Sequence, residues 1–548
     1  MTNGEKLLKR ASVLQGEHSQ WTGLWNKCAR FCLPDEYPIA TSPAAKTRGA
    51  GKQQPIDATG ADCLMKLAAW LFSSTIYQGE QWFDIKARTK KAGDYSIIDT
   101  TLDKVLQAAA RTALETIANS NCIQTYQRFL LGYCCYGTGA FYSEFDDDGE
   151  LVCKQWDITD SVYISENAKG EIDTVFREFE FTARQAVQQF GEENLSEDIR
   201  KAASQPDEQE KRFLFVHAVY PRTRRDKQKK SPDNKPFASV YIEQKTKKVV
   251  YEGGYNTMPY QCPRFYKGGE IYGRSPAMKA IPALRSINIA VEAYLKNVEG
   301  QAKPIVFAPS KVYDKISLQF GTVNPWDSDG GEIKIWSPTG DLRSPIEFAQ
   351  LKAQQVEKMF YCDVFQYLED KKNMTATEAQ LRYDEMIQGI SPVLANLHSE
   401  FFSPFIKRVV NELFTMGKIK IPKEYTTKDG KMPDFEVVYN TRLDTKLKGV
   451  LNANIINFVR MVGELAVALA NAPMAAAYLD VDKIVKLYAR NNNVSNDALR
   501  SDKEIKEALE AQAQQQQQRQ LMGMVNKIDL QKTPERGSQQ DIMVNGVR

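Results

Sequence analysis

Acidic residues gather at one place in the chain where they could hold metal ions. Asp146, Asp147, Asp148 and Glu150 lie within five residues of one another, and two-metal nucleases also use several carboxylates. Those enzymes bring their carboxylates together from different strands, whereas these run consecutively into Asp-Gly, a strong hairpin signal. We therefore predict a solvated turn here, and another turn at 327–331, which matches a calcium-binding loop only in part.

Motifs for nucleotide binding or hydrolysis are incomplete or absent. The string at 48–53 lacks the first glycine and the hydroxyl of a Walker A loop, and the string at 137–139 lacks the third glycine of a dinucleotide loop. Neither G-x-S-x-G nor H-E-x-x-H occurs. We predict that the protein is not an enzyme and has no catalytic residues, no cofactor and no metal site.

The cysteine and histidine pattern indicates a reduced interior. The nine cysteines include no C-x-x-C pair, and the three histidines lie far apart in the chain, so no zinc site is predicted. The vicinal pair Cys134-Cys135 could be redox-active, but small buried residues are the favoured interpretation. We expect buried thiols in a reducing compartment. The cysteines are Cys28, Cys32, Cys63, Cys122, Cys134, Cys135, Cys153, Cys262 and Cys362.

Two groups of basic residues could meet nucleic acid. The first is a run that could bind a phosphate backbone or equally be a solvated loop between two strands, namely Arg222, Arg224, Arg225, Lys227, Lys229 and Lys230. The second is Lys371-Lys372-Asn373, in a polar loop between two helical patterns. In a monomer these are ordinary surface lysines, but in a ring each would become a circle of charge.

Length and charge limit the class of protein. The 548 residues correspond to about three to four domains. Lysine and arginine number 72 against 69 acidic residues, a net charge of +3. A protein that coats nucleic acid is usually far more basic, so contact with nucleic acid must be local. The most apolar stretch, 461–479, contains Glu464, Asn471 and Pro473, and we predict no membrane span.

The first half of the chain changes from helical to strand periodicity. We predict helices over 5–32, 56–76, 96–119, 121–135 and 182–190, the first of them ending before Pro34. Strands are predicted at 140–144, 151–156, 162–165, 174–181, 213–220, 238–243 and 249–251. The fold class is therefore α+β, mostly helical, with helices first and an antiparallel sheet after them.

Two long helices of matched length are predicted next. Ser275-Pro276 is a helix start that leads into an apolar stripe over 277–298, and Gly300 is a typical helix end. After a strand-and-turn segment, Ser344-Pro345 starts the second helix, which we predict to reach 369. A bent helical segment follows over 375–417, broken at Pro392 and Pro404. A strand at 435–439 precedes helices at about 444–472, 479–490 and 496–520.

Four stretches resemble the portal proteins of short-tailed, T7-like bacteriophages, the head-to-tail connector family. They are the helix ending in Phe31-Cys32-Leu33-Pro34 with Asp57-Ala58-Thr59-Gly60 and Gln81-Trp82-Phe83; Met258-Pro259-Tyr260 with Pro263-Arg264-Phe265 and Tyr272-Gly273-Arg274-Ser275-Pro276; the helix pair around Pro304; and 374–382 with the two following prolines. Together they cover most of 5–417 in family order. The most specific are 272–276 and 375–378.

The resemblance implies a division of the chain. It places a wing at 1–270, a first stem helix at 271–300, a clip at 301–345 and a second stem helix at 346–369. The stretch 370–442 would hold the tunnel loop, the kinked helix and the return to the wing. Residues 443–520 would form a helical crown, and 521–548 a C-terminal tail that is disordered when free.

The resemblance also implies a function. Such proteins form a dodecameric ring at one capsid vertex, through which double-stranded DNA passes without sequence preference during packaging and ejection. The DNA-facing tunnel loop would be Lys371, Lys372 and Asn373, and the clip, with Lys311, Trp326 and Trp336, would dock the terminase large subunit and later the tail adaptor. Major capsid and scaffolding proteins are further expected partners. No contact with a membrane is expected. The location would be the virion, with assembly in the host cytoplasm.

Two other classes remain open from the residues alone. One is a DNA-packaging enzyme, a nuclease or ATPase, which needs a Walker motif or converging carboxylates. The other is an internal capsid scaffold or core protein, which predicts irregular oligomers rather than closed rings.

Overall fold

The structure is a computed structural model of the chain. It describes residues 2–39, 55–76, 81–87, 100–226, 231–302, 305–307, 334–336, 343–362, 389–422, 425–426, 432–439, 457–462, 464 and 484. The chain forms two compact units, Met1–Arg88 with Val105–Asp444, and Thr89–Lys104 with Thr445–Arg548. The first unit holds nearly all of the described residues.

The N-terminal part is helical, as predicted. Helix α1 (Asn3–Cys32) begins with a capping box in which the Thr2 hydroxyl accepts from the backbone of Glu5, and it ends at Leu33 before a proline. It is followed by α2 (Thr59–Thr75), α3 (Thr100–Ala118) and α4 (Cys122–Tyr136). Helix α4 ends at Gly137 with φ of 77°, a left-handed conformation that favours glycine.

The β part consists of a hairpin and a larger sheet, both antiparallel. Strands β2 (Gly139–Phe145) and β3 (Leu151–Asp157) form the predicted hairpin around Gly149, and β9 (Tyr260–Gln261) adds a third strand. The larger sheet has the order β4-β5-β6-β7-β8. Its strands are β4 (Val162–Glu166), β5 (Ile172–Thr182), β6 (Arg212–Pro221), β7 (Phe237–Glu243) and β8 (Val249–Tyr255).

Helices cover both faces of the larger sheet. On one face, Leu7 and Leu14 of α1 pack against Phe176 and Val216. On the other face, α5 (Ala183–Phe190) and α6 (Glu197–Ser204) pack against Phe215, the neighbour of Val216 on β6. The alternation along β6 is the period of two that a strand imposes. The described elements confirm the predicted α+β class, although α6 is not among the predicted helices.

One pair of strands joins two segments that lie far apart in the chain. Strand β1 (Phe83–Ala87) pairs antiparallel with β12 (Phe435–Tyr439), with Phe83 opposite Tyr439 and Ala87 opposite Phe435. The strand at 435–439 was predicted, but its partner was not. Phe83 and Ile85 are fully buried and Phe435 is buried, so one face of this small sheet packs into the core, while Glu436 is exposed.

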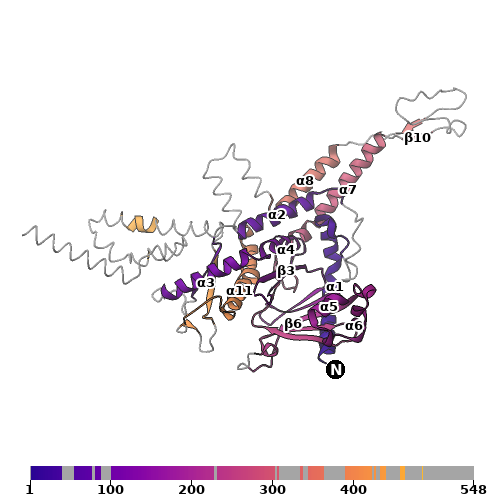
Figure 1. Cartoon of the computed structure of the whole chain (residues 1–548). Coiled ribbons are helices and arrows are strands. Elements are labelled where there is room, and N and C mark those ends of the chain that lie inside the picture. The colour runs from indigo at the N-terminus through magenta and orange to yellow at the C-terminus, as the bar shows by residue number, and fades with distance from the viewer. Residues whose placement is uncertain are drawn as a thin grey trace, which may run out of the picture. The chain divides into compact units, whose positions relative to one another are not determined.

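The two predicted long helices exist but differ in length. Helix α7 (Pro276–Ala302) and α8 (Arg343–Met359) lie side by side (Figure 1), and β10 (Ile305–Phe307) pairs with β11 (Lys334–Trp336) in the segment between them. Two predictions are wrong here. Helix α7 continues through Gly300, and α8 ends at Met359 rather than at 369.

The early end of α8 coincides with a buried turn. Phe360 and Cys362 are buried, and Tyr361 between them takes a left-handed φ of 60°. This turn directs the chain away from the helix axis, which burial of both flanking side chains requires.

The described part of the bent helical segment is irregular beside Pro404 but not at Pro392. Residues 389–397 are helical straight through Pro392, so no break occurs there. A π-helical turn, η9 (His398–Phe402), then leads into α11 (Ser403–Thr415), with Pro404 in its first turn. A π turn widens the helix locally and changes where the side chains point.

Candidate functional site at the base of the helix pair

The start of α7 is fixed to the body by buried polar contacts. The Ser275 hydroxyl donates to the carbonyl of Cys135 at 2.7 Å and accepts from the backbone of Met278 at 3.1 Å, which is the predicted N-cap. Just before it, the backbone N–H of Gly273 donates to the Thr138 hydroxyl at 2.8 Å.

A glycine pair makes this close approach possible. A Cβ atom on Gly137 would lie 2.5 Å from the carbonyl oxygen of Gly273, and one on Gly273 would lie 2.4 Å from the carbonyl oxygen of Gly137. Both obstacles are backbone atoms that cannot swing aside. The two chain segments can therefore pass each other at this distance only without side chains.

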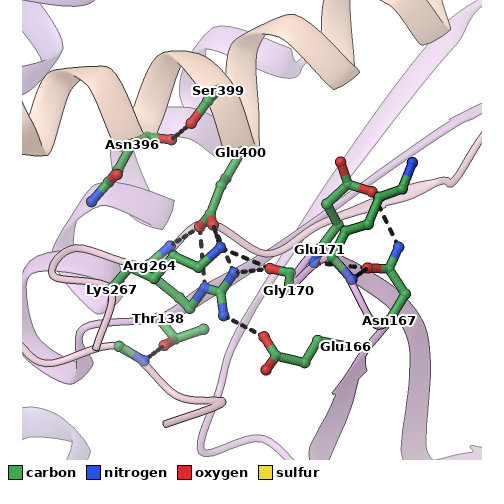
Figure 2. A network of polar contacts seen from close by, with 12 residues as sticks. Thr138, Glu166, Asn167, Gly170, Glu171, Arg264, Lys267, Asn396, Ser399 and Glu400 are labelled. Carbon is green, nitrogen blue, oxygen red and sulfur yellow. Dashed lines mark hydrogen bonds and ion pairs between the residues drawn. The ribbon is translucent and has the colours of Figure 1, made fainter. Parts of the chain in front are cut away.

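A buried arginine joins three separate segments beside the base of α7 (Figure 2). Arg264 is only 1% exposed, and its guanidinium donates to Glu400 at 2.7 Å, to Glu166 at 2.8 Å and to the carbonyl of Gly170 at 2.7 Å. Its backbone N–H also donates to Glu400, at 2.9 Å. Lys267 is 3.4 Å from the same carboxylate.

The charge state of this arginine is secured by its partners. Burial alone would lower the pKa of Arg264, but the hydrogen bonds and charges of Glu400 and Glu166 raise it above its ordinary value. Glu400 lies in the π turn η9, which widens the helix where its carboxylate turns toward Arg264. Removing one partner of such a buried pair leaves an uncompensated charge and is strongly destabilising.

A second buried arginine fastens the same helical segment further along. Arg408 of α11 donates to the carbonyl of Ser143 at 3.1 Å and to the carbonyl of Thr257 at 3.0 Å. Its guanidinium also lies 5.1 Å from the centre of the Tyr255 ring. The helix η9–α11 is thus held against the β strands at two points by charge-assisted hydrogen bonds.

The end of α8 is held at the same base. The hydroxyls of Tyr361 and Tyr266 are hydrogen bonded to each other, and the Cys362 thiol contacts the carbonyl of Cys63 in α2 at 3.7 Å. Lys279 of α7 lies over the Tyr266 ring, 4.1 Å from its centre. The first turn of α7 and the end of α8 therefore both contact Tyr266.

Away from the base, the helix pair exposes apolar side chains. In α7, the buried residues stop at Ile287, and none of the residues from 288 to 302 is buried. Large apolar residues are exposed on both helices beyond the base, which is unusual for a surface helix of a monomer. They are Ile289, Leu295 and Val298 on α7 and Phe348 and Leu351 on α8.

Most predicted DNA-facing and docking residues lie outside the described residues. This holds for Lys371, Lys372 and Asn373 and for Lys311 and Trp326, while Trp336 lies in β11, where only the backbone is described.

The described part of the basic run divides into two. Arg222 donates to the carbonyls of Lys235 and Gly253 at 3.1 and 2.9 Å and so holds the loop together. Arg224 and Arg225 are exposed. The remaining members, Lys227, Lys229 and Lys230, lie outside the described residues.

The prediction of buried thiols is confirmed, since all nine cysteines are free and buried. Within the described residues, no group of three His, Cys, Asp or Glu side chains is placed to hold a metal ion. No helix among those the structure describes has the length and apolar character to cross a membrane.

Comparison with known proteins identifies the class. The model of a family described as "Bacteriophage head to tail connecting protein" matches residues 4–499. The chain therefore belongs to this family of bacteriophage head-to-tail connecting proteins.

Two relatives agree with this assignment. The chain is 25% identical over 536 residues to the "Portal protein" of Salmonella phage epsilon15, covering 95% of this chain and 93% of that protein. It is 24% identical over 505 residues to the "Probable portal protein" of Bordetella phage BPP-1, covering 89% and 87%. The predicted family and the predicted function, that of a phage portal, are confirmed.

Sequence reasoning misses the polar contacts at the base. In the sequence, Arg264 is notable only as part of a short stretch that resembles portal proteins. Its partner Glu400 is 136 positions away. Periodicity and local motifs report only neighbours within about one turn or one hairpin. Nothing local in the sequence indicates that Arg264 is buried or which carboxylate it contacts.

Proposed function

We propose that copies of this chain assemble into a closed ring at one vertex of the capsid and form a channel for double-stranded DNA. The observation that carries this proposal is the set of exposed apolar residues on the parts of α7 and α8 that lie away from the base. On α7 this part begins after Ile287. Their burial against the same helices of neighbouring copies would give a tube of helices. About 25 cal/mol per Å² of apolar surface would favour that assembly.

The division of the subunit follows the prediction from the sequence. In this proposal, α7 and α8 are the stem, the segment with β10 and β11 is the clip, and 1–270 form the wing. The remaining boundaries, 370–442 for the tunnel loop and its return and 443–520 for the crown, stay proposals, as does a disordered tail at 521–548. Twelve copies remain the number expected from the family.

The contacts with DNA and partner proteins are proposed as predicted. Lys371, Lys372 and Asn373 would face the DNA, while Lys311, Trp326 and Trp336 would dock the terminase large subunit and then the tail adaptor. Capsid and scaffolding proteins would contact the ring during assembly in the host cytoplasm. The exposed Arg224 and Arg225 remain available to a phosphate backbone.

The near-neutral charge supports a conduit rather than a nucleic-acid-binding enzyme. A net charge of +3 over 548 residues cannot hold DNA along a long path, and phosphate contacts that did so would oppose sliding. We therefore propose a structural role without catalysis, in which the protein guides DNA and other components supply the energy.

The test is to image the purified full-length protein by negative-stain electron microscopy. We expect closed rings with a central channel, while irregular aggregates or monomers only would contradict the proposal. Particles carrying Lys371→Ala and Lys372→Ala together should form rings of normal appearance but package DNA more slowly. Normal packaging by these particles would remove the two lysines from the proposal without affecting the ring.

A further inference from the structure

We propose that the tripeptide Arg264-Phe265-Tyr266 is a positioning element that fastens the end of α8 and the helical segment over 389–415, which flank residues 363–388, to the base of α7, so that a displacement of one is transmitted to the other. The proposal rests on the proposed function, because 363–388 contain the residues expected to face DNA. The contacts themselves lie entirely within described residues and can be tested without DNA.

The helix that follows 363–388 is held by the first two members. Arg264 donates to both carboxylate oxygens of Glu400, at 2.7 and 3.3 Å, through its side chain. Asn396, one turn earlier, donates to the carbonyl of Phe265 at 3.3 Å. Two successive residues of the tripeptide therefore hold two successive turns of this helix.

The helix that precedes 363–388 is held by the third member. The hydroxyl of Tyr266 is hydrogen bonded to the hydroxyl of Tyr361, which lies just beyond the end of α8. Tyr361 has a left-handed φ of 60°, a conformation that a tyrosine adopts only when its surroundings hold it there. The tyrosine pair therefore fixes the point at which the chain leaves α8.

The tripeptide is in turn fastened to α7 and α4. The backbones of Tyr266 and Arg274 exchange two hydrogen bonds, at 3.0 and 3.1 Å, just before α7 begins. The backbone N–H of Phe265 donates to the carbonyl of Gly137 at 2.9 Å, and the Phe265 ring is fully buried. Lys279, in the first turn of α7, lies over the Tyr266 ring.

This arrangement couples the ends because its contacts are directional and buried. An apolar contact tolerates a small slide, whereas a hydrogen bond weakens steeply once its angle is lost. If either helical end shifts, the tripeptide must move with it or leave a buried group unpaired, and the guanidinium of Arg264 is the costliest group to leave. The tripeptide therefore transmits displacement rather than absorbing it.

The test measures backbone hydrogen exchange in full-length rings carrying Tyr361→Phe, which removes one hydroxyl and keeps the ring. Loss of one hydrogen bond, about 1 kcal/mol, corresponds to roughly fivefold faster exchange at 354–362. The proposal expects faster exchange also at 396–402, on the other side of the tripeptide. A merely structural tyrosine would change only its own segment.

Two matched controls accompany this variant. Tyr163→Phe also removes a buried tyrosine hydroxyl, which donates to Glu178 at 3.1 Å on the larger sheet, and should leave both segments unchanged. Glu400→Gln tests the opposite direction and should speed exchange at 354–362. Its control is Glu412→Gln, which lies on the same helix beside the other buried arginine, 3.7 Å from Arg408.

The outcomes separate this inference from the proposed function. Faster exchange on both sides in Tyr361→Phe and Glu400→Gln supports the coupling. Exchange that rises only beside the substituted residue overturns it, even if the rings form and package DNA normally. Failure of the unsubstituted protein to form rings would contradict the proposed function, while exchange measured on its monomers would still decide the coupling.

Discussion

The two halves of α7 have the same kind of sequence but different surroundings. From Pro276 to Ile287 the apolar stripe is covered by the body of its own subunit, whereas Leu295 and Val298, further along the same stripe, are exposed. The helix shows no change of pattern between them. Hydrophobic periodicity therefore reports that a face will be buried, but it does not report whether the same chain or a second copy buries it.

The strongest test of this difference between the two halves of α7 is to make the same substitution in each half. Leu284 and Leu295 lie eleven residues apart, about three turns, on one face of α7, and they are 1% and 50% exposed. Leu284→Ala should lower the free energy of unfolding by about 2–5 kcal/mol. Leu295→Ala should lower it by less than about 0.5 kcal/mol but should weaken ring assembly.

Denaturation of dilute, monomeric protein measures the first effect, and the concentration at which rings form in sedimentation measures the second. Equal loss of monomer stability in the two variants would contradict the division of α7 into an intramolecular and an intermolecular half.

A smaller effect is the pH dependence of folding stability that a buried histidine causes. His217 is buried between Tyr260 and Ser239, each 3.0 Å from a ring nitrogen, and burial lowers its pKa to about 3. The unfolded chain takes up a proton below about pH 6.5, whereas the folded chain does not. Folding stability contributed by His217 is therefore complete above pH 6.5 and is lost as the pH falls toward 3, by at most about 1.4 kcal/mol per pH unit.

In His217→Gln this part of the pH dependence should vanish. The stability difference between the wild type and the variant should shrink by about 2 kcal/mol between pH 7 and pH 5, from the same slope. Chemical denaturation at several pH values provides the measurement. A difference that is constant across this range would mean that the pKa of His217 is not lowered in the folded protein.

The smallest effect concerns the thiols. Burial raises the pKa of Cys28 and of Cys262 to about 12, and all nine thiols are buried. Iodoacetamide at pH 8 should therefore modify fewer than about one of the nine in native protein and all nine after denaturation. Intact-mass spectrometry gives the count.

Peptide mapping of the same samples sharpens the comparison at the base of the helix pair. Early labelling at Cys362 would indicate that the end of α8 opens more readily than the rest of the body. Early labelling at Cys134 or Cys135 would contradict the placement of this pair in the core.

Local patterns are enough to predict much of the fold. The capping box of α1, the Asp-Gly turn of β2 and β3 and the cap at Ser275 each need only a few neighbouring residues. The predicted end of α8 is wrong because the real end depends on Tyr361 reaching Tyr266, 95 positions away. Strand β1 escapes prediction because five residues carry little periodic signal, and its partner lies far along the chain.

The candidate site is predictable in outline only. The string 272–276 is specific in the sequence, and the structure explains it, since Gly273 allows the close backbone approach and Ser275 caps α7. The buried arginine contacts are tertiary, so they require knowledge of which carboxylate the fold brings near. That knowledge comes from coordinates, not from spacing.

The pairing of β1 with β12 also determines when the body can fold during translation. About 350 residues separate the two strands, and at roughly 5–20 residues per second the first waits about 20–70 s for the second to be made. During that interval Phe83 and Ile85 have no strand beside them, and an unpaired strand is open to other chains. The body of each subunit can close only after residue 439 has been made, so subunits that meet earlier would do so with an open edge.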